Sequence, residues 1–376
     1  MMGQTPPAYP RNNGHQLRRP QDARRSNLAL ILQSLYDQPK LSRAELARRT
    51  GLSKVTISDL VAELIDDGLV AETGQTLGAP GKPGVSLCVR DDTRDIIALD
   101  LAATDTIVGG VYSLTGERRR RKTWSLSDTR GEETLNAVLD VASDLAKACR
   151  YPVLGVGVGT PGTVDSAGRV LSAPNLSWTD VDLPAILAER LGVPAIVAND
   201  ANAAVVAEQA FDGAPDSLIR IQISGGVGAG LVIGGSVVFG SSYAAGEIGH
   251  VVVDPDGDPC SCGKRGCLET VISVPALTRA ILAAPGRRDA ILARAGDCLG
   301  TTLAPIVGML DLPVIVLGGP EALLGGVFTD AVQAVLAARA HSEFRSDVAL
   351  RASALGDDAV LLGAVALVLR HTLGVT

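Results

Sequence analysis

The sequence predicts an α/β protein in two parts, a small N-terminal winged helix-turn-helix followed by a larger two-lobed domain. Two observations lead to this fold class. Up to residue 90, apolar residues recur at helical spacing and are interrupted by helix caps and turn glycines. From Asp95 onward, strand patterns alternate with helix patterns, and the order strand-strand-strand-helix-strand suggests two related lobes with a cleft between them.

Length and composition agree with several domains. A chain of 376 residues with 46% hydrophobic residues can bury two or three cores. Residues 1–24 are rich in Pro, Asn, Gln and Arg, and we expect a disordered basic arm there. This stretch lacks the apolar segment of a signal peptide, and no apolar run approaches the roughly 20 residues that span a membrane. We therefore expect a cytoplasmic protein.

Three short helices are expected between residues 25 and 68. The first follows Ser26, where Leu and Ile recur every three or four residues. Ser42 and Glu45 form a capping box that opens the second helix, and Ser53 caps a third helix that runs to about Asp67. Gly68 stands where a helix-ending glycine belongs.

A wing is expected to complete the domain at residues 25–90. Leu69–Glu72 and Val85–Val89 have the pattern of short strands, and a glycine-rich segment joins them. Three helices with a tight turn before the third are typical of a DNA-reading domain. A small helical bundle for protein contacts is the alternative, but the turn, the cap and the wing together favour DNA. The residues expected to reach phosphates or base edges are Ser53, Lys54, Val55, Thr56 and Ser58.

Charge is distributed unevenly along the chain. Residues 1–90 contain 12 Lys and Arg against 8 Asp and Glu, whereas the remaining residues contain 22 against 33. A basic N-terminal segment on an acidic body fits a nucleic-acid-binding module joined to a domain that binds another ligand. A solvated tail would give the same sum.

The larger domain, residues 91–376, is expected to begin with three antiparallel strands. These and the following elements are expected at Ile96–Leu101, Thr106–Tyr112, Arg120–Trp124, Glu132–Cys149 (helix), Val153–Val158, Ala195–Ala198, Ala201–Phe211 (helix), Leu218–Ile223 and Ala229–Ile233. The basic run Arg118–Arg121 is interpreted as the solvated edge of a strand.

A group of soft metal ligands lies at residues 250–267. One imidazole and three thiols supply the four ligands of a closed tetrahedral zinc site: His250, Cys260, Cys262 and Cys267. Gly263 and Gly266 allow the loop to curl so that the sulfurs face one point. Unpaired cysteines or a disulfide are the alternative, but Cys260 and Cys262 are too close to pair comfortably, and nothing indicates secretion.

This stretch also resembles a known family. Ala245–His250, followed by the pattern Cys-x-Cys-Gly-x-x-Gly-Cys-x-Glu, is similar to the signature of the ROK family of sugar kinases and repressors. Further segments that agree are 157–165, 173–178, 198–203 and 225–230, and the resemblance covers about residues 96–376. It implies a ribonuclease-H-like, actin- or hexokinase-type architecture. It also implies that Lys82 probes the minor groove of DNA from the wing.

The resemblance further implies a sugar site. The positions that match hexose-binding residues of the family are Asn175, Asn199, Asp200, Glu247, His250 and Glu269. Carboxylates and amides suit a sugar because its hydroxyls both donate and accept hydrogen bonds. His250 would bind zinc through one ring nitrogen and face the sugar with its other edge. Asp200 is where the family's kinases place their general base.

The chain departs from the kinase pattern at the expected ATP site. The first phosphate loop of the kinases reads Asp-x-Gly-Gly-Thr, whereas this chain has Asp100-Leu-Ala-Ala-Thr104. Two added methyl groups fill space where the backbone approaches a phosphate. The second loop, residues 224–228, keeps its glycines but lacks the usual threonine, and Gly-Gly-Pro at 318–320 replaces a run of glycines. We expect a degenerate ATP site.

Together these observations favour a sugar-responsive transcriptional regulator, a repressor that binds an operator as a homodimer or homotetramer. The alternative is an ATP-dependent sugar kinase with an accessory N-terminal domain. A zinc-dependent hydrolase is disfavoured, because four protein ligands leave no position for water.

Overall fold

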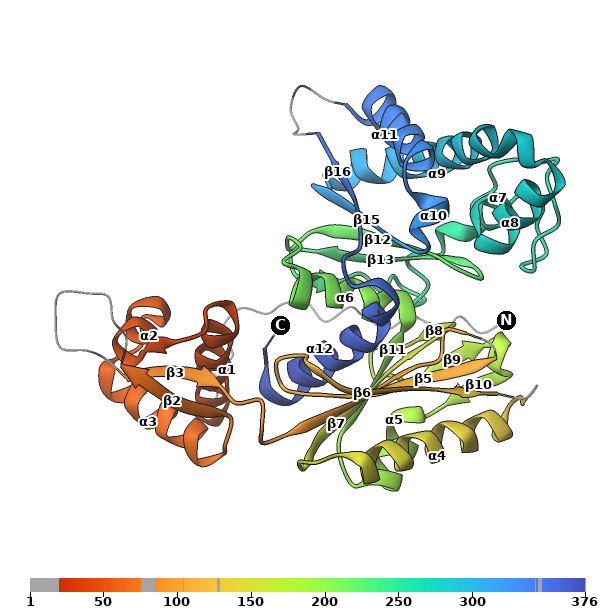
Figure 1. Ribbon diagram of the computed structural model, residues 1–376. Coiled ribbons are helices and arrows are strands. Elements are labelled where there is room, and N and C mark those ends of the chain that lie inside the picture. Colours follow the sequence, from red (N-terminus) through yellow and green to blue (C-terminus); the bar gives the residue numbers. More distant parts are fainter. Residues whose placement is uncertain are drawn as a thin grey trace, which may run out of the picture. The chain divides into compact units, whose positions relative to one another are not determined.

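The computed structural model (Figure 1) describes residues 20–75, 85–103, 105–126, 129–341, 343 and 347–375. The chain divides into two compact units. The first contains the residues up to Val89 together with Leu373–Val375, and the second contains Arg90–Thr372. The C-terminal residues 373–375 therefore belong to the first unit, whereas the sequence analysis assigned them to the larger domain.

The first unit is a three-helix domain with a three-stranded sheet. Its elements are α1 (Pro20–Asp37), β1 (Leu41–Ser42), α2 (Arg43–Thr50), α3 (Lys54–Asp66), β2 (Val70–Gln75) and β3 (Val85–Val89). The sheet order is β1-β3-β2, and all pairs are antiparallel. Strand β1 was not predicted, because two residues are too few to show an alternating pattern.

Local capping signals account for the helix boundaries. Ser42 and Glu45 form the predicted capping box, and Ser53 accepts a hydrogen bond from the Thr56 amide at the start of α3. Gly51 and Gly68 both have φ of 71°, the left-handed conformation that ends a helix most easily at glycine. The predicted boundaries are confirmed here.

The start of α1 differs from the expectation. Residues 20–24, predicted as part of a disordered arm, are helical. Arg24 forms an ion pair with Glu63 on α3, so tertiary contact extends the helix beyond its apolar stripe. The rest of the predicted arm, residues 1–19, and the wing segment 76–84 with Lys82 lie outside the described residues.

The second unit contains two five-stranded sheets of the same topology. The first has the order β11-β7-β4-β5-β6 and the second β14-β13-β12-β15-β16. In each, the first three strands in chain order form an antiparallel meander, and two parallel strands follow on its other side. This repeat confirms the predicted two-lobed, ribonuclease-H-like architecture.

The strands and helices of the first lobe were mostly predicted. They are β4 (Asp95–Asp100), β5 (Thr106–Tyr112), β6 (Arg118–Ser125), α4 (Glu132–Ala148), β7 (Val153–Thr160), α5 (Leu183–Leu191) and β11 (Ala195–Asn199). A small sheet that was not predicted lies between β7 and α5 in the chain. It consists of β8 (Thr163–Val164), β9 (Val170–Ala173) and β10 (Trp178–Val181), with a 3-10 turn at Pro174–Leu176.

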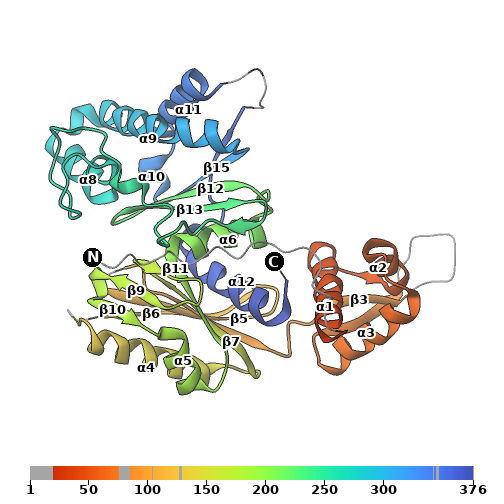
Figure 2. The ribbon, with the colours of Figure 1, turned by 180° about the vertical axis from the view of Figure 1, so that it is seen from behind.

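Helices cover both faces of the first sheet, with α4 and α5 on one face and α12 (Ala359–Leu373) on the other (Figures 1 and 2). Glycines on β7 permit the close approach of α12. A Cβ at Gly157 would lie 2.2 Å from the Ala364 carbonyl oxygen, and a Cβ at Gly159 would lie 2.2 Å from Val360. These glycines alternate along the strand and so share one face.

The second lobe continues the chain after α6 (Asp200–Asp212). Its strands are β12 (Leu218–Ile223), β13 (Val227–Ile233), β14 (Ser236–Val237), β15 (Val314–Gly318) and β16 (Ala349–Ala352), and its helices are α7 (Leu268–Ile272), α8 (Val274–Ala283), α9 (Arg288–Leu310), α10 (Glu321–Leu324) and α11 (Val327–Ala340). A Cβ at Gly230 on β13 would lie 2.3 Å from the Ala201 carbonyl oxygen, so α6 packs directly on this sheet.

One helical segment, Pro285–Leu310, is by length and composition apolar enough to cross a membrane. Half of its apolar window is buried inside the protein. Leu299 and Leu303 are fully buried in the core of the second lobe, and a Cβ at Gly296 would lie 2.4 Å from a carbonyl oxygen of α11. Packing in this core accounts for the apolar composition.

Candidate functional site

The predicted metal ligands come together in the structure. The ligand atoms of His250, Cys260, Cys262 and Cys267 all lie within 4.8 Å of one another. Cys260 Sγ is 3.6 Å from His250 Nδ1, and Cys262 Sγ is 3.6 Å from Cys267 Sγ. A tetrahedral zinc ion with ordinary bond lengths requires about 3.5 to 3.8 Å between ligand atoms, and these two separations meet that requirement. One imidazole and three thiols are also donors that suit zinc.

Two glycines shape this loop. Gly263 and Gly266 have φ of 88° and 63°. A Cβ at Gly266 would lie 1.4 Å from the Asp254 carbonyl oxygen, so only glycine fits at that position. The isolated bridge Pro259↔Arg265 closes the turn that carries Cys260 and Cys262.

His250 connects the cluster to an acidic residue. Its Nδ1 faces Cys260, and its Nε2 lies 3.8 Å from Glu247 Oε2. The segment that carries both residues rests on β13, because a Cβ at Gly246 or Gly249 would lie 1.9 or 2.1 Å from a β13 carbonyl oxygen. This close packing on β13 fixes the backbone on which Glu247 stands.

Glu269 lies two residues after the last cysteine, at the start of α7. Its Oε2 accepts a hydrogen bond of 3.1 Å from the Val227 amide at the start of β13. Gly225, Cys260 and Glu269 also line a pocket of about 180 Å³ beside the cluster. Glu269 therefore joins the cysteine loop to the β12–β13 turn.

Asp200 begins α6 at the end of β11, and Asn199 holds it in place. Asn199 Oδ1 accepts from the Asn202 amide as the helix cap, while its Nδ2 donates to Asp200 Oδ1 and to the Gly162 carbonyl oxygen. Asp200 Oδ1 also accepts from the Ala201 amide. The side chain of Asn199 is thus occupied within the protein, and it positions Asp200.

Asp200, Asp100 and Glu247 form an acidic cluster. Burial, followed by repulsion from Asp100, raises the pKa of Asp200 to about 7, and Glu247 adds to this effect. Burial also raises the pKa of Asp100 to about 6, although its Oδ1 accepts from the Ala102 amide. Sequence reasoning named Asp100 only as part of a phosphate loop. Its place beside Asp200 has no local signal.

The remaining site residues are more dispersed. Asn175 is exposed on the 3-10 turn between β9 and β10. A buried carboxylate that was not predicted from the sequence supports α6. Glu208 is fully buried and accepts hydrogen bonds from Arg220 at 2.9 Å and from Ser353 at 2.6 Å. This network joins α6 to the second sheet behind the acidic cluster.

The expected DNA-reading residues lie at the exposed start of α3. Ser53 caps the helix, and Lys54 and Ser58 are exposed. Val55 is 70% exposed. Thr56 is half-buried, and its hydroxyl lies 2.8 Å from that of Ser53.

Similarity to known proteins covers both units. Residues 96–371 match the ROK family, and residues 29–76 match the MarR family. The chain belongs to the ROK family. It is 28% identical over 384 residues to the xylose repressor of Caldicellulosiruptor bescii, an alignment that covers 92% of this chain and 96% of that protein.

Two solved structures of ROK proteins resemble this one. A ROK family transcriptional regulator, a homologue of the E. coli MLC protein, superimposes with a TM-score of 0.82 at 23% identity over 94% of this chain and 97% of that chain. A ROK family glucokinase from Streptomyces griseus, solved with glucose and AMPPNP, gives a TM-score of 0.63 at 26% identity over 72% of this chain and 98% of that chain. The regulator matches both units, and the glucokinase matches most of the second.

Within this ROK chain, the two segments that match the family's phosphate loops lie after β4 and between β12 and β13. Residues 224–226 form the turn of the β12–β13 hairpin, in which the Ser224 amide donates to the Gly226 carbonyl oxygen. In the first loop, Ala102 is half-buried and Ala103 exposed, and Thr104 lies outside the described residues.

Proposed function

We propose that this protein is a sugar-responsive DNA-binding transcriptional repressor. The observation that carries the proposal is the presence, in one chain, of an exposed helix of DNA-reading type and an acidic cluster tied to a metal-binding loop. The full-length similarity to a protein named as a xylose repressor supports the same function. The effector is a sugar or sugar phosphate, and its site lies between the two lobes of the second unit.

The carboxylates of Asp200, Glu247 and Glu269 would accept hydrogen bonds from sugar hydroxyls, and Asn175 and the imidazole of His250 would add further polar contacts. Charge-assisted bonds of this kind are about twice as strong as neutral ones. Asn199 would act indirectly, because its amide holds Asp200. Closure of the lobes on a sugar would shift the equilibrium between an open and a closed state of the repressor. The size of this shift depends on how much more tightly the sugar binds one state than the other.

Zinc is the proposed resident metal, held by His250, Cys260, Cys262 and Cys267. When bound, it supplies a rigid cross-link in the loop, and the four protein ligands leave no place for a reactive water. The two acidic residues that flank this loop would then bind the sugar. Glu247 precedes His250, and Glu269 follows Cys267, so both sugar contacts depend on the order of the loop.

DNA would be read by α3 in the major groove. Lys54, Ser53, Ser58 and Thr56 suit phosphates and base edges, and Val55 suits a thymine methyl group. Lys82 of the wing is proposed for the minor groove. A two-fold homodimer, alone or within a tetramer, would bind a pseudo-palindromic operator in the cytoplasm.

A sugar kinase is the second candidate, and one observation favours it. A pKa of about 7 suits Asp200 as a general base near neutral pH. The alanines at 102 and 103 oppose it, because phosphoryl transfer depends on a closely held phosphate. A coupled assay with Mg-ATP and a panel of sugars decides between the two. Robust turnover by the wild-type protein would replace the repressor proposal with the kinase.

The main test measures sugar binding by thermal shift with a panel of sugars and sugar phosphates. Asp200→Asn should weaken binding of the sugar that stabilises the wild type by about 1 to 3 kcal/mol. The matched control is Asp182→Asn, which removes one carboxylate from the exposed cap of α5. Equal affinity in the Asp200→Asn variant and the wild type would refute the assigned site.

A further inference from the structure

The edge strand β6 carries the densest positive charge of the second unit. Five consecutive residues, here called the basic strand, are Arg118, Arg119, Arg120, Arg121 and Lys122. All five line an open groove of about 670 Å³ with Thr123, Leu355, Asp357 and Asp358. The chain beyond residue 90 is acidic overall, with 33 Asp and Glu against 22 Lys and Arg, a count that includes these five. A local excess of positive charge on an acidic domain indicates an anionic partner.

A β-bulge organises the basic strand into two faces. Tyr112 pairs with Arg118 and Val111 with Arg120, so Arg119 is the extra residue. The bulge places Arg118 and Arg121 on the same face, where they bind Asp358 at 2.6 and 2.8 Å. The simple alternation expected from the sequence would have put them on opposite faces.

Arg120 and Lys122 share the other face and remain available. Within the described part of the chain, no carboxylate lies in ion-pair distance of either side chain, and both are exposed. Lys122 Nζ lies 4.8 Å from the centroid of the Trp124 ring, a cation–π contact that leaves the side chain exposed.

The groove suits a chain of phosphates better than a small molecule. Among the described residues that line it, Leu355 is the single apolar side chain, and none is aromatic. A sugar or base would therefore find no surface to stack on. Five residues of strand extend about 16 Å, and double-stranded DNA presents one negative charge per roughly 1.7 Å of its axis.

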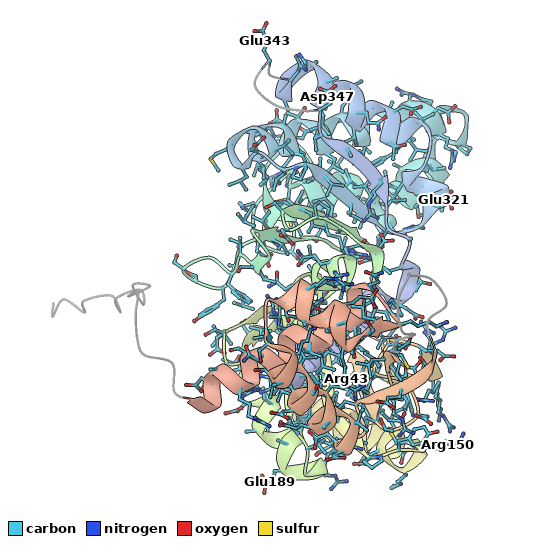
Figure 3. All side chains as sticks on the ribbon, turned by 90° about the vertical axis from the view of Figure 1, so that its left-hand side faces the viewer. Arg43, Arg150, Glu189, Glu321, Glu343 and Asp347 are labelled. Carbon is cyan, nitrogen blue, oxygen red and sulfur yellow. The ribbon has the colours of Figure 1, made fainter. Side chains whose placement is uncertain are left out.

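The basic strand also starts close to the covalent junction with the DNA-binding unit. The side chain of Arg119 donates to the Asp91 carbonyl oxygen and pairs with Asp95 at 2.8 Å. Asp91 is two residues beyond Val89, where the first unit ends. Arg119 and Arg150 both stack on Tyr151, at 5.0 and 5.3 Å, and Arg150 projects from the surface of this lobe (Figure 3).

We propose that the basic strand is a second, sequence-independent contact for the phosphate backbone of DNA, made by the sugar-binding unit itself. This inference rests on the proposed DNA-binding function. Arg120 and Lys122 supply the contacting charges, while Asp358 holds Arg118 and Arg121 in place. Such a contact would strengthen binding to any DNA duplex long enough to extend beyond the bases that α3 contacts. The choice of operator sequence would still depend on α3.

The test uses the full chain and a fluorescent 60-base-pair duplex of mixed sequence, with affinity measured by anisotropy from 50 to 200 mM KCl. The variant R120Q/K122Q removes two charges from the basic strand. Each lost phosphate contact lowers the slope of log affinity against log salt by about 0.9. Over this fourfold range the wild-type affinity should therefore fall about 12-fold more than that of the variant.

The matched control is R287Q/R339Q, which removes two exposed charges from the second lobe. Its slope should equal that of the wild type. An unchanged slope in R120Q/K122Q, or an equal decrease in the control, would overturn the proposal. Inorganic phosphate could instead stabilise the wild type and the control but not R120Q/K122Q, while the salt dependence of DNA binding stays the same in all three. That result would assign the groove to a small anion and overturn the DNA contact. Lys54→Ala separates the two hypotheses: if it too leaves DNA binding unchanged, the proposed DNA-binding function of α3 fails.

Discussion

Replacing Asp200 by asparagine should make the sugar-free protein more stable at neutral and alkaline pH. The carboxyl has a pKa raised to about 7, because partial burial removes water from it and because it lies near Asp100 and Glu247. In the unfolded chain its pKa returns to an ordinary value near 3.8. Between these values the folded state binds more protons than the unfolded state, so stability falls as pH rises from about 4 to about 7.

The structure sets the magnitude of this effect. At about 1.36 kcal/mol per pH unit, the interval between the two pKa values corresponds to an upper limit of roughly 4 kcal/mol. Asp200 is half-buried, and solvent therefore reduces the cost to about 1 to 3 kcal/mol. Asparagine keeps the oxygen that accepts from Ala201 and Asn199, so the substitution should break neither hydrogen bond.

Thermal unfolding of the metal-loaded protein without sugar, at pH values from 4.5 to 8.5, measures this difference. Asp200→Asn should gain several degrees over the wild type at pH 8, and the gain should shrink towards pH 4.5. Asp182→Asn is the control of opposite sign, because its carboxylate caps α5 and pairs with Arg169 at 2.9 Å. A variant less stable than the wild type at pH 8, with a deficit that persists at pH 4.5, would refute the reasoning.

Three further outcomes are expected. Cys262→Ser should lose the single metal ion per chain and weaken sugar binding at least tenfold, as shown by metal analysis and thermal shift, whereas Cys149→Ser should retain both. Lys54→Ala should weaken DNA binding and lower its salt slope by about 0.9, with sugar affinity unchanged; an intact slope would mean that Lys54 meets no phosphate. Gly157→Ala should lower the free energy of unfolding by about 1 to 3 kcal/mol in urea titrations, because its methyl group would strike the backbone of α12; Gly286→Ala, with open space around it, should change stability little.

The sequence by itself determined the features that depend on near neighbours. Caps, turn glycines and apolar spacing set the boundaries of α2 and α3, since these signals act within one or two helical turns. The four soft ligands lie within 18 residues, so a single loop brings them together whatever the rest of the chain does. The repeated order of strands and helices likewise determined two similar lobes.

Only the tertiary structure decided which distant residues meet. Asp100 and Asp200 are far apart in the sequence, and their shared burial raises both pKa values. Asn199 matched a sugar-binding position, yet its side chain caps α6 and holds Asp200. Arg118 and Arg121 reach Asp358 because of a bulge in β6. Desolvation and charge proximity arise from packing between elements, and no local pattern of residues encodes them.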